Sequence, residues 1–130
     1  MERDERSGSN PIARNGCSSL VFVYGTLLNG QRNHDYLRGA VALGAVCTEA
    51  EYRLVSLGSY PALRNYGDAA IPGELYLVNS STLAALDRLE GHPDFYRRGL
   101  VKLNDGRTAL TYFLPADQYK DAEQISCWPP

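Results

Sequence analysis

The chain has 130 residues, which is enough for one domain of ordinary size. Its composition is 44% hydrophobic and 22% charged, as in globular proteins, and this excludes a chain that is disordered throughout. The net charge of -2 lacks the basic excess of a dedicated nucleic-acid-binding protein. No apolar run approaches the roughly 20 residues that cross a bilayer. We therefore expect neither nucleic acid nor a membrane as a partner.

The cysteines Cys17, Cys47 and Cys127 are few, odd in number and far apart in the sequence. Such a set does not predict a disulfide framework and fits a reducing compartment, so we expect a cytoplasmic protein. The charged N-terminal residues are not followed by an apolar segment, which is unlike a secretory signal. With only two histidines, His34 and His92, and no Cys-x-x-Cys pair, we expect no metal site.

The first 18 residues have the composition of a tail, because turn and linker residues follow charges of alternating sign. We predict a flexible N-terminal tail over residues 1–18 and a single folded domain over residues 19–130. Residues 20–24 form a short apolar run rich in β-branched and aromatic side chains. This run predicts a strand that is buried on both faces and ends at Gly25. A loop and a short helix with Asn33 as its N-cap should follow.

Two further strands are predicted over residues 41–47 and 52–57. Ser59-Tyr60-Pro61 should end the second of them, because Pro61 has no N–H to donate to a strand ladder. Residues 71–78 predict another strand. A helix over residues 82–89 should come next, with Ser80 or Ser81 as its N-cap and Gly91 just beyond its end.

A hairpin is predicted last, with strands over residues 97–103 and 107–114 around an Asn104-Asp105-Gly106 turn. The chain therefore predicts about six strands and two helices. These elements do not alternate as in a regular βαβ array, so we expect an α+β fold with a curved or barrel-like sheet.

Glu90 is the most informative candidate for chemistry. On a helix of 3.6 residues per turn it shares one face with Leu83 and Leu86, inside the stripe that should point at the core. A carboxylate aimed at an apolar interior is costly unless it is paired or its pKa rises, which makes Glu90 a candidate catalytic residue. The alternative is a helix-end glutamate that reaches solvent or pairs with Arg97 or Arg98.

The sequence Tyr24-Gly25-Thr26-Leu27 is a second candidate site. A buried strand that runs into a glycine and a loop can expose successive backbone N–H groups, which hold a carboxylate or an oxyanion. The alternative is an ordinary glycine at the end of a strand. His34, at the start of the short helix, is more typical of a surface or capping residue than of a base or ligand.

Four segments together resemble the gamma-glutamylcyclotransferase-like proteins, and the gamma-glutamylamine cyclotransferases most of all. Val21 to Leu27 resembles the opening strand and loop of that family, and Asn33-His34 resembles the start of its next helix. Gly73 to Tyr76 resembles its central strand, and Leu86 to Gly91 with Tyr96-Arg97-Arg98 resembles its catalytic segment. The resemblance implies an α+β fold in which short helices flank a small, mixed, barrel-like sheet. It implies Glu90 as the catalytic residue and Tyr24, Gly25, Thr26 and Leu27 as the substrate-binding residues.

The resemblance also implies an activity. The α-amine of a gamma-glutamyl amine or related gamma-glutamyl compound would attack its own γ-carbonyl, giving 5-oxoproline and the free amine, with a glutamate as general acid and base. The partner would be this small-molecule substrate, and no cofactor is required. Two alternatives stay open: a gamma-glutamyl-removing step in a biosynthetic pathway, and a non-catalytic small-molecule binding module on the same fold.

Overall fold

The computed structural model describes residues 18–130. Most of the predicted tail, residues 1–17, lies outside the described residues. Ser18 is the first residue of strand β1, so the folded domain begins one residue earlier than the sequence analysis predicted.

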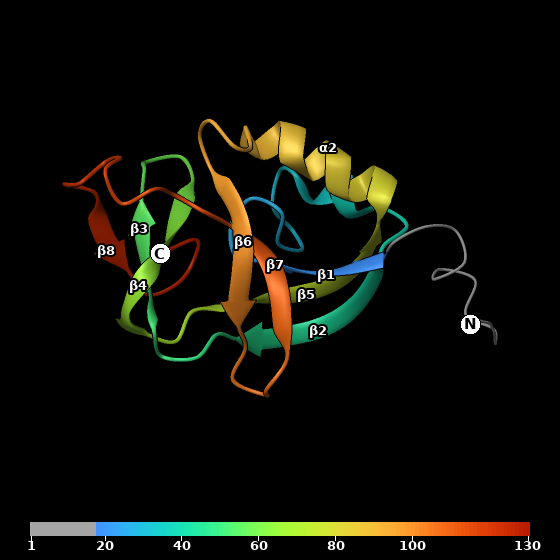
Figure 1. Ribbon diagram of the computed structural model, residues 1–130, viewed down its shortest axis with the longest axis horizontal. Helices are drawn as coiled ribbons and strands as arrows, with labels where there is room; N and C mark the ends of the chain where they lie inside the picture. The colour runs from blue at the N-terminus through green and yellow to red at the C-terminus, as the bar shows by residue number, and fades with distance from the viewer. Residues whose placement is uncertain (1–17) are drawn as a thin grey trace.

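The described chain forms eight strands, one α-helix and one 3₁₀ helix (Figure 1). In chain order they are β1 (Ser18–Val23), η1 (His34–Leu37), β2 (Val41–Cys47), β3 (Tyr52–Ser56), β4 (Pro61–Ala69), β5 (Pro72–Asn79), α2 (Ser80–Glu90), β6 (Arg97–Lys102), β7 (Thr108–Phe113) and β8 (Glu123–Ile125). The predicted hairpin corresponds to β6 and β7, and the predicted main helix to α2.

All eight strands belong to one mixed sheet in the order β2-β5-β1-β7-β4-β3-β8, with β6 paired to β7 outside this path. The pairs β1–β7 and β4–β7 are parallel and the others are antiparallel. The α+β prediction is confirmed. The sheet is open and not closed into a barrel, because β2 and β8 form its two ends.

Strand β7 brings β1 and β4 together. Antiparallel pairing with β6 occupies one edge of β7 along its whole length. On the other edge β7 pairs with β1 near its start, at Leu110 and Val21, and with β4 at its end, at Phe113 and Leu63. The chain that leaves β1 and the chain that enters β4 therefore lie next to each other.

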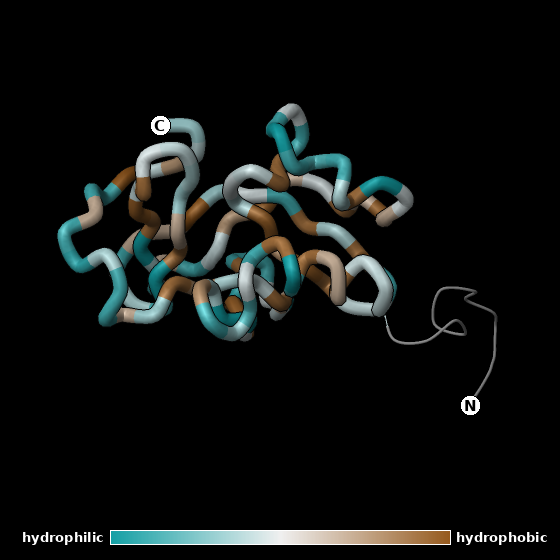
Figure 2. Tube along the Cα trace, turned by 90° about the horizontal axis from the view of Figure 1, so that it is seen from above, coloured by the Kyte–Doolittle hydropathy of each residue, from teal (hydrophilic) through white to brown (hydrophobic). Residues whose placement is uncertain are grey.

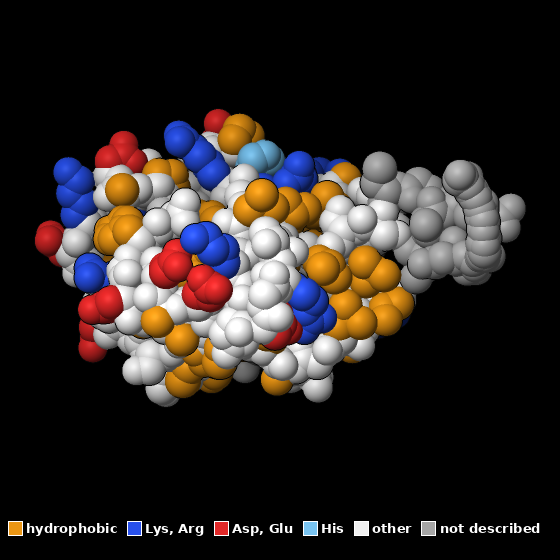
Figure 3. All heavy atoms as spheres, turned by 60° about the horizontal axis from the view of Figure 1, so that its bottom comes forward, with side chains coloured by type: hydrophobic (Ala, Val, Ile, Leu, Met, Phe, Trp, Pro, Cys, Tyr) orange, Lys and Arg blue, Asp and Glu red, His pale blue; other side chains and the backbone are white. Residues whose placement is uncertain are grey.

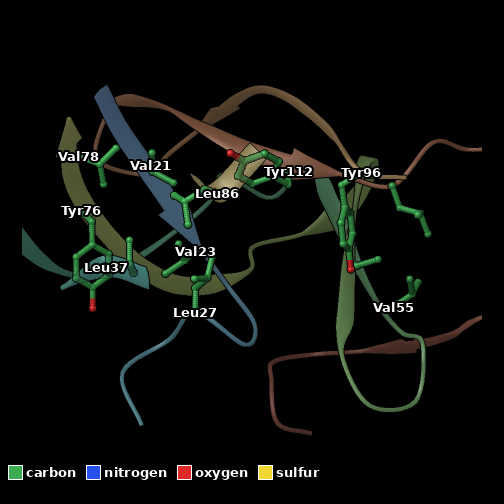
Figure 4. Packing of buried hydrophobic residues seen from close by; sticks show 12 residues of the cluster. Val21, Val23, Leu27, Leu37, Val55, Tyr76, Val78, Leu86, Tyr96 and Tyr112 are labelled. Carbon is green, nitrogen blue, oxygen red and sulfur yellow. The ribbon is translucent and has the colours of Figure 1, made fainter. Parts of the chain in front are cut away.

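The core lies on both faces of β1, as predicted. Val21 and Val23 belong to one buried cluster, which α2 covers with Leu86, whereas Phe22 and Tyr24 belong to a second cluster. Figure 4 shows Leu86 beside the two valines. In Figure 2 the hydrophobic stretches of the chain lie mainly in the middle and the outer loops are hydrophilic. Burial on both faces fixes the end of β1, and with it the position of the loop that follows.

Several local predictions are corrected. Strand β3 ends at Ser56, before Pro61, as predicted. Pro61 itself, however, pairs with Ser56 as the first residue of β4, where a proline N–H is not needed. The helix N-cap is Asn79, whose side chain accepts a hydrogen bond from the Thr82 N–H at 2.8 Å, in place of a serine. Asn33 precedes a 3₁₀ helix and its side chain makes no capping hydrogen bond. Strands β4 and β8 were not predicted.

The surface shows no single dominant charge on the face seen in Figure 3, where acidic and basic side chains are interspersed and hydrophobic ones form small groups. No helix in the described part of the chain has the length and apolar character needed to cross a membrane.

Candidate active site

A cavity of about 230 Å³ opens where β1 ends, β4 begins and α2 ends. All five residues predicted for the site line this cavity: Glu90, Tyr24, Gly25, Thr26 and Leu27. The structure therefore brings together a helix-end carboxylate and a loop that lies more than 60 residues away in the sequence. The size of the cavity suits a small molecule.

Glu90 is the last residue of α2 and is partly buried. Gly91 ends the helix in the left-handed conformation, with φ 69°, as predicted. The Gly91 N–H donates to the Arg88 carbonyl, which closes the last turn and fixes the direction of the Glu90 side chain. Burial raises the pKa of Glu90 to about 7. A carboxyl group with this pKa exchanges protons readily near neutral pH.

The predicted alternative pairing of Glu90 with Arg97 or Arg98 is not found. The Arg98 guanidinium lies 2.5 Å from the Asp87 carboxylate, one turn earlier in the helix. Within residues 18–130 no cation lies within ion-pair distance of Glu90. No positive charge in this part of the chain therefore counteracts the rise that burial causes in the pKa of Glu90.

Four tyrosines line the cavity, and the sequence analysis assigned only Tyr24 to the site; the others are Tyr60, Tyr96 and Tyr112. The Tyr24 hydroxyl donates to the Tyr112 carbonyl at 2.7 Å and accepts from the Leu63 N–H at 3.2 Å. The Tyr96 hydroxyl donates to the Pro61 carbonyl at 2.7 Å. The Tyr24 hydroxyl thus joins β7 to β4, and the Tyr96 hydroxyl joins the segment before β6 to the start of β4.

Tyr112 donates its hydroxyl proton to the Asp87 carboxylate at 2.6 Å. Burial raises the pKa of Tyr24, Tyr96 and Tyr112, and the nearby charge of Glu90 acts in the same direction on each. The three phenols therefore stay protonated and act as hydrogen-bond donors. Tyr112 could have been suspected from the alternating pattern of the second hairpin strand. Tyr96 was part of a segment that carries the family resemblance, but no role was assigned to it.

The loop after β1 is a tight turn, in which the Leu28 N–H donates to the Gly25 carbonyl at 3.0 Å. Among the described residues, no hydrogen bond uses the N–H groups of Gly25, Thr26 or Leu27. Because these residues line the cavity, the loop offers consecutive free donors to a bound molecule.

Asn33 and His34, at the start of the short helix η1, hold this loop in place. The Asn33 amide donates to the Thr26 hydroxyl at 2.9 Å, and the Asn33 N–H donates to the Thr26 carbonyl at 2.9 Å. His34 Nδ1 lies 2.9 Å from the Leu27 carbonyl, which can only accept, so Nδ1 is the donor. The expected capping role of these two residues is replaced by a role in fixing the loop.

Glu74 on β5 supports the loop from the other side. Its carboxylate accepts hydrogen bonds from the Asn29 N–H and from the Tyr76 hydroxyl, both at 2.9 Å. Burial, with this carboxylate as a further cause, raises the pKa of Tyr76 to about 12.

Gly25 is required by close packing. A Cβ atom there would lie 2.6 Å from Pro61 Cγ and 2.8 Å from Pro61 Cδ. Its φ is not in the left-handed region, so the backbone conformation alone does not require a glycine here. The chain that leaves β1 thus rests directly on the chain that enters β4.

The sequence profile of the gamma-glutamyl cyclotransferase, AIG2-like family matches residues 21–129. The chain belongs to this family. A Vibrio cholerae protein, provisionally named a gamma-glutamylcyclotransferase, is 48% identical over 93 residues, which are 72% of this chain and 79% of the relative. The Escherichia coli gamma-glutamylcyclotransferase family protein YtfP is 35% identical over 101 residues, covering 77% of this chain and 88% of that protein.

Solved structures agree with the family assignment. The crystal structure of an AIG2-like protein from Mus musculus superposes with a TM-score of 0.76 at 26% identity, covering 85% of this chain and 88% of that one. The solution structure of YtfP gives a TM-score of 0.64 at 32% identity, with coverages of 85% and 96%. The resemblance to the gamma-glutamylcyclotransferase-like proteins is confirmed at the level of the family, and membership of this family supports a cyclotransferase that acts on a small molecule.

Proposed function

We propose that this protein is a cofactor-independent cyclotransferase that converts a gamma-glutamyl amine or related gamma-glutamyl compound into 5-oxoproline and the free amine. The single observation that carries the proposal is the placement of Glu90. Its carboxylate, with a pKa raised to about 7, shares a small cavity with the free N–H groups of residues 25–27. This pairs a proton-transfer group with donors for negative charge.

The substrate supplies its own nucleophile in this reaction. Its α-ammonium gives one proton to Glu90, and the freed nitrogen attacks the γ-carbonyl carbon within the same molecule. A new C–N bond closes a five-membered ring and places a negative charge on the carbonyl oxygen. The enzyme's main tasks are therefore to fold the substrate and to move protons.

Glu90 then returns its proton to the nitrogen of the leaving amine, and the old C–N bond breaks. The Glu90 carboxylate then takes a second proton from the ring nitrogen, which keeps one hydrogen, and passes it to the departing amine. The α-ammonium thus loses two protons in total, and the departing amine gains both and leaves as an ammonium ion. Atoms and charge balance, and no metal or cofactor takes part.

The N–H groups of Gly25, Thr26 and Leu27 would hold either the α-carboxylate of the substrate or the oxyanion of the tetrahedral intermediate. Tyr24 has a structural part in this scheme, because its hydroxyl already serves two backbone groups. It forms the wall against which the substrate folds.

The proposal is tested by incubating the protein with several gamma-glutamyl compounds and identifying the products by mass spectrometry. We expect 5-oxoproline and the free amine in equal amounts. Free glutamate in place of 5-oxoproline would show hydrolysis. No product from any compound would favour a binding module and would contradict the proposal.

A further inference from the structure

Arg32 adds a positive charge to the cavity. Among the described residues that line the cavity, Arg32 is the only basic one and Glu90 is the only acidic one. Arg32 is exposed, whereas Glu90 is partly buried, so the cation stands on the open side of the cavity. A molecule that enters meets Arg32 before it reaches Glu90.

The backbone holds Arg32 at this position. The Gln31 N–H donates to the Leu28 carbonyl at 2.9 Å, and the Asn33 N–H donates to the Thr26 carbonyl at 2.9 Å. Arg32 lies between these two anchored neighbours, in the segment that joins β1 to η1 (Figure 1). Its Cα is therefore fixed beside the cavity, while its long side chain stays free to follow a ligand.

The nearby acids are engaged elsewhere. The Asp35 carboxylate lies 3.4 Å from the Arg38 guanidinium, and Glu74 accepts from the Asn29 N–H and the Tyr76 hydroxyl. Over residues 18–130 no ion pair or hydrogen bond engages the Arg32 guanidinium. The cation is thus available to an anionic group of the bound molecule.

The proposed reaction decides which group of the substrate meets this cation. The α-amine must reach the partly buried Glu90, so the gamma-glutamyl part occupies the inner cavity. The leaving amine extends toward the open side, where Arg32 stands. We infer that Arg32 is a specificity-determining residue that favours gamma-glutamyl compounds whose leaving amine carries a carboxylate. This inference rests on the proposed function.

The charge of Arg32 acts in opposite directions on two kinds of substrate. A leaving amine that bears a carboxylate is attracted, and one that bears a further ammonium group is repelled. A charge-assisted contact that is partly open to solvent should change kcat/KM by about fivefold to tenfold. Added salt should weaken the effect because it screens exposed charges.

The test compares gamma-glutamylglycine with gamma-glutamylglycinamide, two substrates that differ only in the charge of the leaving amine. We expect kcat/KM for 5-oxoproline formation to be about fivefold to tenfold higher for gamma-glutamylglycine. Arg32→Gln should abolish this preference and leave kcat/KM for gamma-glutamylglycinamide nearly unchanged. Arg32→Lys should keep most of it.

Arg88→Gln is the matched control, because Arg88 is an exposed arginine that does not line the cavity. It should leave the preference intact. Equal kcat/KM values for the two substrates in the parent protein would overturn the inference alone. An equal loss of kcat/KM with both substrates in Arg32→Gln would also overturn it, since Arg32 would then bind the gamma-glutamyl part that the two substrates share. Absence of 5-oxoproline from every gamma-glutamyl compound would overturn the proposed function, and this inference with it.

Discussion

The Arg98 guanidinium lies 2.5 Å from the Asp87 carboxylate, although Glu90 stands only one helical turn away. The two carboxyl groups on α2 therefore have different surroundings. Asp87 has a cation and the Tyr112 hydroxyl as partners, whereas burial raises the pKa of Glu90 to about 7. Two neighbouring acids with different environments are typical of sites in which one acid transfers protons and the other positions the surrounding groups.

Replacing Asp87 with Asn should lower the pKa of Glu90. The change removes a nearby negative charge and releases Arg98, and both effects favour the ionised form of Glu90. The acid limb of the kcat/KM profile for 5-oxoproline formation should therefore move to lower pH. Arg98→Gln is the control and should not move the limb in that direction. An unchanged limb in Asp87→Asn would show that Arg98 has no influence on Glu90.

The stability difference between the parent protein and Glu90→Gln should depend on pH. The pKa of Glu90 rises from its ordinary value of 4.5 to about 7 on folding, so the folded state binds more protons between these values. Stability of the parent therefore falls as pH rises from about 4.5 to about 7, and Gln lacks this dependence. Urea unfolding at pH 5 and pH 8 should show a larger advantage of Glu90→Gln at pH 8. A difference that is independent of pH would contradict the raised pKa.

Gly25→Ala should destabilise the protein by about 1–3 kcal/mol, because the new Cβ meets the Pro61 ring at 2.6 Å. Pro61→Ala removes the two ring carbons that clash. Gly25→Ala should therefore cost much less in the Pro61→Ala background. Urea unfolding of the two single variants and the double variant measures this coupling. Equal costs in both backgrounds would mean that the close approach does not explain the glycine.

The Asn33–Thr26 hydrogen bond should contribute to substrate binding through the loop. Asn33→Ala should raise KM by about threefold to tenfold with little change in kcat, as expected for a lost hydrogen bond that holds a binding loop. Thr26→Val removes the same bond and keeps the loop N–H groups. The double variant should be no worse than either single variant. Additive losses would indicate that the two side chains act separately.

The sequence was most informative where local patterns determine structure. The helical spacing of Leu83, Leu86 and Glu90 predicted an inward carboxylate, and the apolar run before Gly25 predicted a strand buried on both faces. The Asp105-Gly106 turn predicted the hairpin of β6 and β7. These features depend on periodicity and turn chemistry, which short segments carry by themselves.

The remaining features depend on contacts between distant segments. The pairing of Arg98 with Asp87 in place of Glu90, and the packing of Gly25 on Pro61, join residues that no local pattern relates. The same holds for the Tyr96 hydroxyl, which reaches the carbonyl of residue 61. Strand β8 has only three residues, too few for a hydrophobic period to be detected.

The most direct test of the account is turnover by Glu90→Gln on a gamma-glutamyl substrate that the parent protein converts. Gln keeps the shape of the side chain and removes the group that exchanges protons. We predict that kcat for 5-oxoproline formation falls by about 10²–10⁴-fold, while the variant is at least as stable as the parent. Glu123→Gln, a matched change at an exposed residue outside the cavity, should turn over normally. Normal turnover by a folded Glu90→Gln protein would contradict the assignment of Glu90 as the proton-transfer residue.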